Sequence, residues 1–287
     1  MQRVSVEQVR SRGWLAGVKT VACERAVVLA AASAAAVQTP YRQTVMSRQG
    51  RAGYQGPGTV VVEEIPHTLC NRVASFIELA QQLADAGRRF DQRGWVLGTS
   101  GNFSAVVDRV PLRLAITPSG AWKGRLVPDA FLEIDERGGV VRGGEGRASA
   151  EAPLHLEIVR QRGAGAVLHT HSVWSTILSD RYAGHQGFHI QGYEMLKGLA
   201  GIVTHEHREW IPVLDNDQDM DRLAGIVRRT LEARPAAHAF LLRRHGLYTW
   251  GQTLDEAVRH VEILEFLLES VGRTEIWSTD GRNQDSG

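Results

Sequence analysis

The chain has 287 residues, of which 43% are apolar and 23% charged, and its 33 basic and 32 acidic residues leave a formal net charge of +1. This composition is typical of a globular protein. It excludes a collagen-like repeat, a coiled-coil rod and a wholly disordered chain, and the small net charge gives no general attraction to nucleic acid. Two cysteines cannot build a disulfide framework, and no apolar run reaches the ~18 residues that span a membrane, so we expect a cytoplasmic protein.

The first 65 residues differ from the rest of the chain. Basic residues outnumber acidic ones up to Gly53, a run of Ala and Val covers 27–37, and Gly56-Pro57-Gly58 follows. Such a segment can be a secretory signal peptide, an Arg-rich transit peptide or an upstream extension. We favour the extension, disordered or translated from a start codon assigned too early, because the basic lead-in is long for a secretory signal.

The predicted elements begin just after this extension. Apolar residues at helical spacing from Leu69 to Ala84 predict an amphipathic helix that ends near Gly87. Short apolar runs at 103–107 and 112–117 predict strands. Ser149 is placed to cap a helix over 151–162, and 166–170 reads as a buried strand.

The second half continues the same mixture of helices and strands. We expect a helix capped by Ser172, a helix over 223–233, strands over 240–244 and 247–250, and a last helix opened by a Thr253–Glu256 capping box. The sequence has no strict βαβ repeat, so it predicts one α+β or three-layer α/β domain over 66–277 and a loose tail over 278–287.

Histidines give the first indication of chemistry. His169 and His171 lie two residues apart at the end of a predicted strand, so both imidazoles point to one face. His245 ends another apolar strand and is the best candidate for a third ligand. Three histidines with an open fourth position are typical of a catalytic zinc site. A second H-x-H, His205 and His207, is followed by charged residues, and we expect it to lie on a solvated surface.

Two turns and two carboxylates complete the candidate residues. The turns Thr99–Asn102 and Thr117–Gly120, with Lys123 close behind, can bind a phosphate through backbone N–H groups, hydroxyls and a cation. The carboxylates are Glu151 and Glu194. Glu194 lies in a mostly uncharged stretch, where apolar neighbours can raise the pKa of a proton shuttle, although a single Glu is more often an exposed surface residue. Asp215–Asp219 begins like a calcium loop but lacks its Gly and bidentate Glu, so it predicts a turn.

The order of these motifs resembles the class II aldolase/adducin family. The resemblance runs from about Leu69 to Leu268, through T-S-G-N, T-P-S-G, S-A-E, H-T-H and R-H-G. Within the family, the segments 163–172, 192–197, 215–219 and 244–251 are similar to those of its sugar-phosphate dehydratases of methionine salvage. Residues 1–65 have no counterpart, which supports their interpretation as an extension.

The resemblance implies a three-layer α/β/α fold with a mostly antiparallel central sheet, and a homotetramer that acts on a small sugar phosphate, with neither nucleic acid nor membrane as a partner. It implies one Zn²⁺ per subunit on His169, His171 and His245. Glu194 falls on the dehydratases' general acid/base, and Glu151 on the residue that holds metal or moves protons in aldolases. The phosphate-binding turns would supply Ser100, Gly101, Asn102, Ser119 and Gly120. Ala150 replaces a second Ser of some aldolases, which removes one phosphate contact.

Three other interpretations remain open. A class II sugar-phosphate aldolase or epimerase would use the same metal but break a C–C bond. An adducin-like interaction module would keep the fold without catalysis. A zinc hydrolase of another fold would explain H-x-H but leave the phosphate turns without a role.

Overall fold

A computed structural model describes the backbone of residues 67–144 and 146–280, with side chains over 75–144 and 146–276. The extension expected over 1–65 and most of the tail expected over 278–287 therefore lie outside the described residues. The chain divides into two compact units, Met1–Ala74 and Ser75–Gly287, and every described strand belongs to the second. Within the described residues, no helix has the length and apolarity that crossing a membrane requires.

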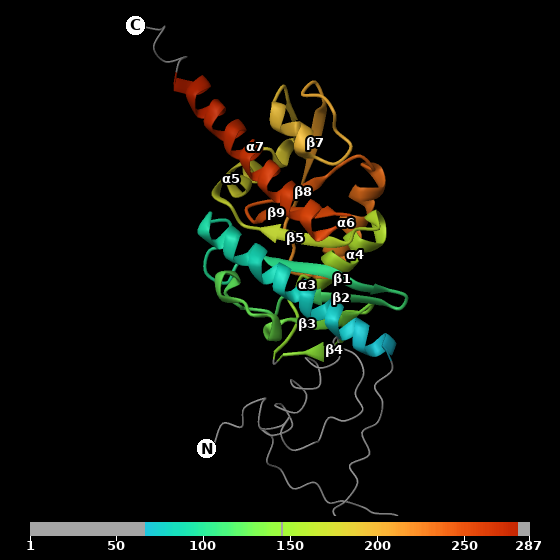
Figure 1. Ribbon diagram of the computed structural model, residues 1–287. Coiled ribbons are helices and arrows are strands. Elements are labelled where there is room, and N and C mark those ends of the chain that lie inside the picture. Colours follow the sequence, from blue (N-terminus) through green and yellow to red (C-terminus); the bar gives the residue numbers. More distant parts are fainter. Residues whose placement is uncertain (1–66, 145, 281–287) are drawn as a thin grey trace, which may run out of the picture. The chain divides into compact units, whose positions relative to one another are not determined.

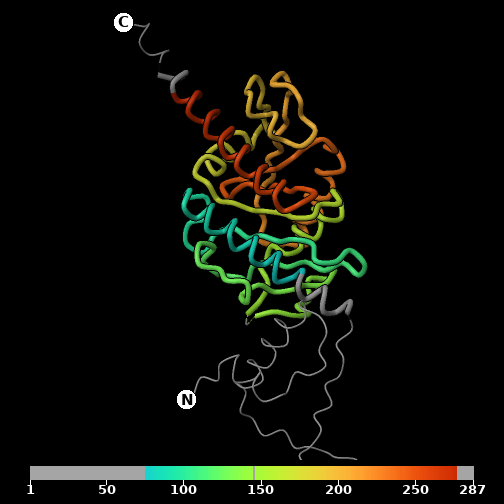
Figure 2. The backbone as a smooth tube through the Cα atoms, in the orientation of Figure 1, coloured from blue at the N-terminus to red at the C-terminus, as the bar shows by residue number. Residues whose placement is uncertain are grey.

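A nine-stranded sheet forms the middle of the second unit. Its order is β4-β3-β2-β1-β5-β9-β8-β7-β6, and every neighbouring pair is antiparallel except β7 with β8. Figure 2 shows the backbone of β5 between those of β1 and β9, so distant segments of the sequence become neighbours. The strands are β1 (Asn102–Arg109), β2 (Leu112–Ile116), β3 (Leu132–Asp135), β4 (Val140–Gly143), β5 (Ala166–Thr170), β6 (Gly187–Gln191), β7 (Arg208–Leu214), β8 (Ala239–Leu242) and β9 (Gly246–Gly251).

Helices cover both faces of this sheet. One face packs against α4 (Ala152–Arg162) and α6 (Met220–Ala233), and the other against α3 (His67–Gln92), α5 (Val173–Arg181) and α7 (Leu254–Asp280). In Figure 1, α3 and α7 cross in front of the strands. Successive residues of β2 show the alternation, since Leu114 and Ile116 join the core under α4 and Ala115 joins the core under α3. The three-layer fold with a mostly antiparallel sheet is confirmed.

The first helix is longer than the sequence predicts. α3 continues through Gly87 to Gln92, so the expected end at Gly87 is wrong. A Cβ at Gly87 would lie 2.5 Å from the carbonyl oxygen of Lys123, which shows that this glycine lets the helix pass close to another backbone. The chain turns only at Gly94, whose φ of 74° suits a glycine.

The start of α4 also differs from the expectation in a way that matters for the site. Its N-cap residue is Glu151, whose side chain makes no capping hydrogen bond, and the Ser149 hydroxyl accepts only from the Glu151 N–H at 3.3 Å. The Glu151 carboxylate is therefore free for another use. By contrast, Ser172 caps α5 as expected, accepting from the Ser175 N–H at 3.1 Å.

Four strands were not predicted. β3 and β4 lie at one edge of the sheet, and β4 is largely exposed, so apolar alternation is weak there. β6 and β7 form the other edge, where Pro212 within β7 argues against a strand in the sequence. Tertiary pairing decides the conformation of these segments, because edge strands carry little periodic signal of their own.

A buried carboxyl group lies between α7 and β5. Glu265 is 2% exposed and accepts a hydrogen bond from the Thr170 hydroxyl at 2.6 Å. Burial raises the pKa of Glu265 to about 7. The carboxyl group is thus neutral in the folded protein at a pH where the unfolded chain would ionise it.

We expect Glu265→Gln to stabilise the protein at pH 8 and to leave its stability nearly unchanged at pH 4.5. The native state prefers the protonated carboxyl, so wild-type stability falls as pH rises from about 4.5 to about 7, by up to about 3 kcal/mol. The amide keeps the shape and removes this loss. Urea unfolding at the two pH values measures the difference, with Glu232→Gln, which changes an exposed carboxyl group on α6, as the control. An equal offset at both pH values would contradict the interpretation.

Candidate metal and substrate site

Three histidines converge where β5 ends and β9 begins. These antiparallel neighbours pair Thr170 with Leu247, so the residues just beyond β5 meet those just before β9. His169 Nε2 lies 2.8 Å from His171 Nε2 and 3.3 Å from His245 Nε2. Two nitrogens bound ~2.05 Å from one tetrahedral ion would lie about 3.3 Å apart. The side chains named by the H-x-H motif and the distal R-H-G motif thus form one cluster able to hold a metal.

The R-H-G turn is shaped to present His245. Arg244 has a φ of 53°, in the left-handed region that an L side chain rarely adopts, and its N–H donates to the Ser179 hydroxyl at 3.0 Å. A Cβ at Gly246 would lie 2.0 Å from the Thr170 carbonyl oxygen. The glycine therefore lets β9 approach β5 closely. His245 Nδ1 lies 3.4 Å from the Asn216 side-chain oxygen, on the segment after β7.

The protonation of the cluster suits a cation. His169 Nδ1–H donates to the Leu247 carbonyl at 2.9 Å, which leaves Nε2 as a bare lone pair. Burial lowers the pKa of His169 well below its usual value and the pKa of His171 to about 3, and it lowers that of His245. Three neutral imidazoles whose ligand atoms lie within 4.8 Å of one another can together hold a divalent ion.

Glu151 approaches the cluster from the start of α4. Its Oε2 lies 3.5 Å from His169 Nε2 and its Oε1 lies 3.4 Å from His245 Nε2. The Asn102 amide donates a hydrogen bond to Oε2. The structure thus places this carboxylate against His169 and His245, within reach of a metal ion or of a substrate proton.

An aromatic stack supports the histidines from behind. The Tyr248 ring lies 3.9 Å from the His169 ring at an interplanar angle of 13°, and Phe240 stacks on the other side of Tyr248 at 5.0 Å. Burial, and then the Glu151 charge, raise the pKa of Tyr248 well above its usual value. The tyrosine therefore stays neutral, and the stack fixes the plane of the His169 ring.

The two candidate phosphate turns are joined by Lys123. Its buried ammonium donates to the Thr99 carbonyl at 2.7 Å and to the Ala121 carbonyl at 2.8 Å. Burial lowers the pKa of Lys123 to about 8, and the Glu151 charge acts in the opposite direction. The charge of Lys123 in turn helps to lower the pKa of His171, so the joined turns lie beside the histidine cluster.

Each turn shows a feature that suits a ligand. The Ser100 hydroxyl is buried without a hydrogen-bond partner among the described residues. Gly101 has a φ of 73°, and a Cβ there would lie 2.6 Å from the His169 carbonyl oxygen, which presses the first turn against β5. In the second turn, Ser119 N–H donates to the Arg147 carbonyl at 2.8 Å, and Gly120 faces open space. The amide of Asn102 is already engaged by Glu151.

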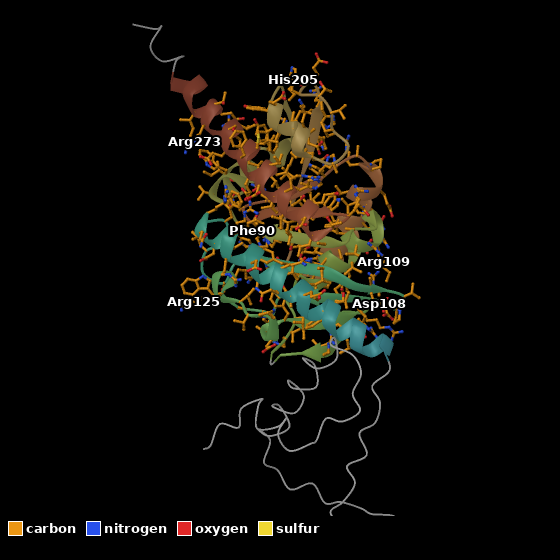
Figure 3. All side chains as sticks on the ribbon, viewed as in Figure 1. Phe90, Asp108, Arg109, Arg125, His205 and Arg273 are labelled. Atoms are coloured by element: carbon orange, nitrogen blue, oxygen red, sulfur yellow. The ribbon has the colours of Figure 1, made fainter. Side chains whose placement is uncertain are left out.

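Among the described residues, no contact is seen between Glu194 and the histidine cluster. Its side chain is 71% exposed, and its ion pairs within the described residues are with Lys197 at 2.6 Å and His205 at 3.7 Å. Lys197 lowers the pKa of Glu194, so the expectation of a pKa raised by apolar neighbours is wrong. Glu194 and His205 both lie on the segment that connects β6 with β7. His205 is labelled at the top of the view in Figure 3.

The second H-x-H is not part of the cluster. The described metal-ligand group contains only His169, His171 and His245. His205 is exposed, as expected for a solvated surface, whereas His207 Nε2 lies 2.7 Å from an oxygen of the buried Glu209. The sequence places Glu209 among the charged residues of an expected solvated surface, but its side chain is buried.

Sequence reasoning missed two buried residues that shape the site. His155 lies one helical turn after Glu151 and is fully buried, and Tyr248 stacks on a candidate ligand. The i, i+4 spacing of Glu151 and His155 could have indicated a shared face of α4. Nothing in the sequence indicated that Tyr248 lies against His169, because their register depends on the pairing of β5 with β9.

Comparisons with known proteins show which family the chain resembles. The family model described as "Class II Aldolase and Adducin N-terminal domain" matches residues 81–271. A "Methylthioribulose-1-phosphate dehydratase" of Pseudomonas paraeruginosa is 46% identical over 193 residues, which are 67% of this chain and 92% of that enzyme. One from Methylococcus capsulatus is 46% identical over 66% of this chain and 91% of its own. The L-fuculose-1-phosphate aldolase structure from Thermus thermophilus superposes with a TM-score of 0.55 at 25% identity, covering 73% of this chain and 97% of that one.

We expect His245→Ala to weaken metal binding by more than the ~10–100-fold that loss of an outer partner costs, because one of three nitrogen donors is removed. His205→Ala, which changes an exposed histidine outside the cluster, is the matched control and should keep the wild-type affinity. Chelator competition and metal analysis after dialysis measure both. Retention of metal by His245→Ala, or its loss from His205→Ala, would reject the ligand assignment.

Proposed function

The chain belongs to the class II aldolase and adducin family, and from this premise we propose that it is a methylthioribulose-1-phosphate dehydratase. The reaction converts 5-methylthioribulose 1-phosphate to 5-methylthio-2,3-dioxopentyl 1-phosphate in methionine salvage. The observation that carries the proposal is the cluster of three histidines and Glu151 beside two joined phosphate-type turns, in a chain 46% identical to a relative of that name.

The proposed metal is Zn²⁺, one per subunit, held by His169, His171 and His245. Three neutral imidazoles with converging Nε2 atoms are a donor set that zinc favours. When bound there, the metal supplies a Lewis acid that polarises the substrate carbonyl.

The residues of the chain then orient the substrate and move its protons. The Ser100 hydroxyl, which has no partner among the described residues, the open turn at Gly120 and the ammonium of Lys123 bind the phosphate, which fixes the register of the carbon chain. A carboxylate removes the proton from C3. The hydroxyl on C4 takes up a proton and leaves as water, and the resulting enol tautomerises to the diketone. One water is lost and no redox change occurs.

Glu151 and Glu194 are the two carboxylates for proton transfer. Glu151 lies against the histidines of its own subunit. Glu194 is exposed on its own subunit, where water would surround it. We therefore assign Glu194 to the site of a neighbouring copy in the proposed homotetramer, where the subunit interface would exclude that water.

Incubation of the zinc-loaded protein with 5-methylthioribulose 1-phosphate tests the function. Formation of the diketone 1-phosphate supports it. Release of smaller fragments by retro-aldol cleavage would instead favour a sugar-phosphate aldolase, and recovery of an epimer would favour an epimerase. Binding without conversion would leave the interaction module as the better interpretation.

Mixing two inactive variants tests the assignment of Glu194. Glu194→Gln should keep metal and lose ~10²-fold or more of dehydration, the usual contribution of a general acid/base. His245→Ala should lose metal. If Glu194 acts across an interface, mixed tetramers regain activity at about one quarter of their sites, since a site then needs one intact group from each of two chains. If mixing restores nothing, Glu194 acts within its own chain, and an active Glu194→Gln would leave Glu151 as the base.

The pH dependence of substrate binding tests Lys123. The ammonium is charged below its pKa of about 8 and neutral above it. If it binds the phosphate, KM should be flat between pH 7 and 7.5 and should rise by about tenfold per pH unit once the amine has lost its proton. Lys123→Met should show a high KM without this rise, and Arg125→Met, an exposed cation two residues later, should keep the wild-type profile. A flat wild-type KM up to pH 9.5 would exclude the role.

A further inference from the structure

A chain of buried hydrogen bonds leads away from Glu151 into the core. The Asn102 amide nitrogen donates to Glu151 Oε2, and the Asn102 side-chain oxygen contacts His155 Nε2. His155 Nδ1 lies 2.7 Å from the Ser104 hydroxyl. Ser104 and His155 are fully buried and Asn102 is 5% exposed, so water does not compete for these groups.

The direction of every hydrogen bond in this chain follows from the Asn102 amide. An amide nitrogen donates and an amide oxygen accepts, and Asn102 has its NH₂ toward Glu151 Oε2 and its oxygen toward His155 Nε2. That oxygen needs a donor, which must be His155 Nε2–H. Burial lowers the pKa of His155 to about 3, so the ring is neutral and Nδ1 is bare. Nδ1 then accepts from the Ser104 hydroxyl.

The backbone makes this arrangement rigid. Asn102 and Ser104 alternate on β1 and face α4, where Glu151 and His155 lie one turn apart. The His155 ring meets Tyr248 edge to face at 5.9 Å, and Tyr248 stacks on His169. The same packing that orients the candidate metal ligand therefore orients His155.

We propose that Ser104 and His155 are positioning residues that fix the Asn102 amide, and through it the rotamer of Glu151, so that Oε2 is held and Oε1 is presented on the His245 side for ligation or proton transfer. The chain is a brace and not a proton wire, because a neutral amide cannot pass a proton on. Its catalytic consequence rests on the proposed function, whereas its hydrogen-bond polarity does not.

The tautomer of His155 tests the polarity without metal or substrate. Imidazole ¹⁵N spectra of the metal-free full chain should show His155 neutral, with the proton on Nε2, throughout pH 6–8. His155→Gln identifies the signal. A proton on Nδ1 would reverse every bond of the chain and overturn the proposal, even if the protein proves to be a dehydratase.

Two variants of His155 then separate positioning from packing. Gln can place an N–H near the position of Nε2, whereas Asn reaches only the position of Nδ1. We expect His155→Asn to lower kcat by ~10–100-fold with KM changed less than about threefold, because a displaced carboxylate harms the chemical step more than binding. His155→Gln should restore kcat to within about fivefold of wild type. Equal kcat values for the two variants would reject the brace.

Ser104→Ala gives the same test if the histidine variants do not fold. It removes the donor to His155 and should lower kcat. Thr249→Val is the matched control, because its buried hydroxyl donates to the His238 carbonyl at 2.8 Å outside the chain. Both should lose similar stability, because each variant removes the donor of one buried hydrogen bond, but only Ser104→Ala should lose turnover. Equal turnover in these two variants would overturn the proposal. If wild type fails to dehydrate the substrate, the proposed function falls while the tautomer result still decides the brace.

Discussion

The pairing of β5 with β9 is the constraint on which the site depends. Its register places His169 opposite Tyr248 and Thr170 opposite Leu247, and it brings imidazoles 76 residues apart in sequence to 3.3 Å. The same register provides the Leu247 carbonyl that selects the tautomer of His169. A slip of one residue would turn every side chain of β5 to the other face and would place Thr170 where His169 now lies. Gly246, which allows the close approach of the two strands, is part of this constraint.

Much of the fold was predictable because its central strands and long helices carry strong periodic patterns. The strands over 112–116 and 166–170 and the helices α4, α6 and α7 lie within a few residues of the expected ranges. The edge strands were not predictable, since their conformation depends on neighbours and not on their own alternation. Gly87 shows a subtler limit, because a glycine needed for close packing looks the same in sequence as one that ends a helix.

The residues of the candidate site were likewise predictable only in part. Residues in compact motifs, such as His169 and His171, could be found because their spacing fixes a shared face. Asn102 was assigned to a phosphate turn by its motif, but its amide faces Glu151, a relation between β1 and α4 that no local pattern encodes. The environment of Glu194 was misjudged because only Leu196 of its helical turn packs into the core, whereas the side chains of Glu194 and Met195 are exposed.

The parallel pairing of β7 with β8 restricts where the chain can gain or lose residues. Two parallel neighbouring strands need a crossover connection, which α6 supplies. The carboxyl ends of β7 and β8 then lie side by side, and ligands often bind at such a position, where the strand order of a sheet reverses. Asn216 follows the first of these ends and His245 the second, so their 3.4 Å separation depends on the crossover between them. Insertions or deletions within α6 would shift one end against the other. The length of this crossover is therefore constrained by the position of His245.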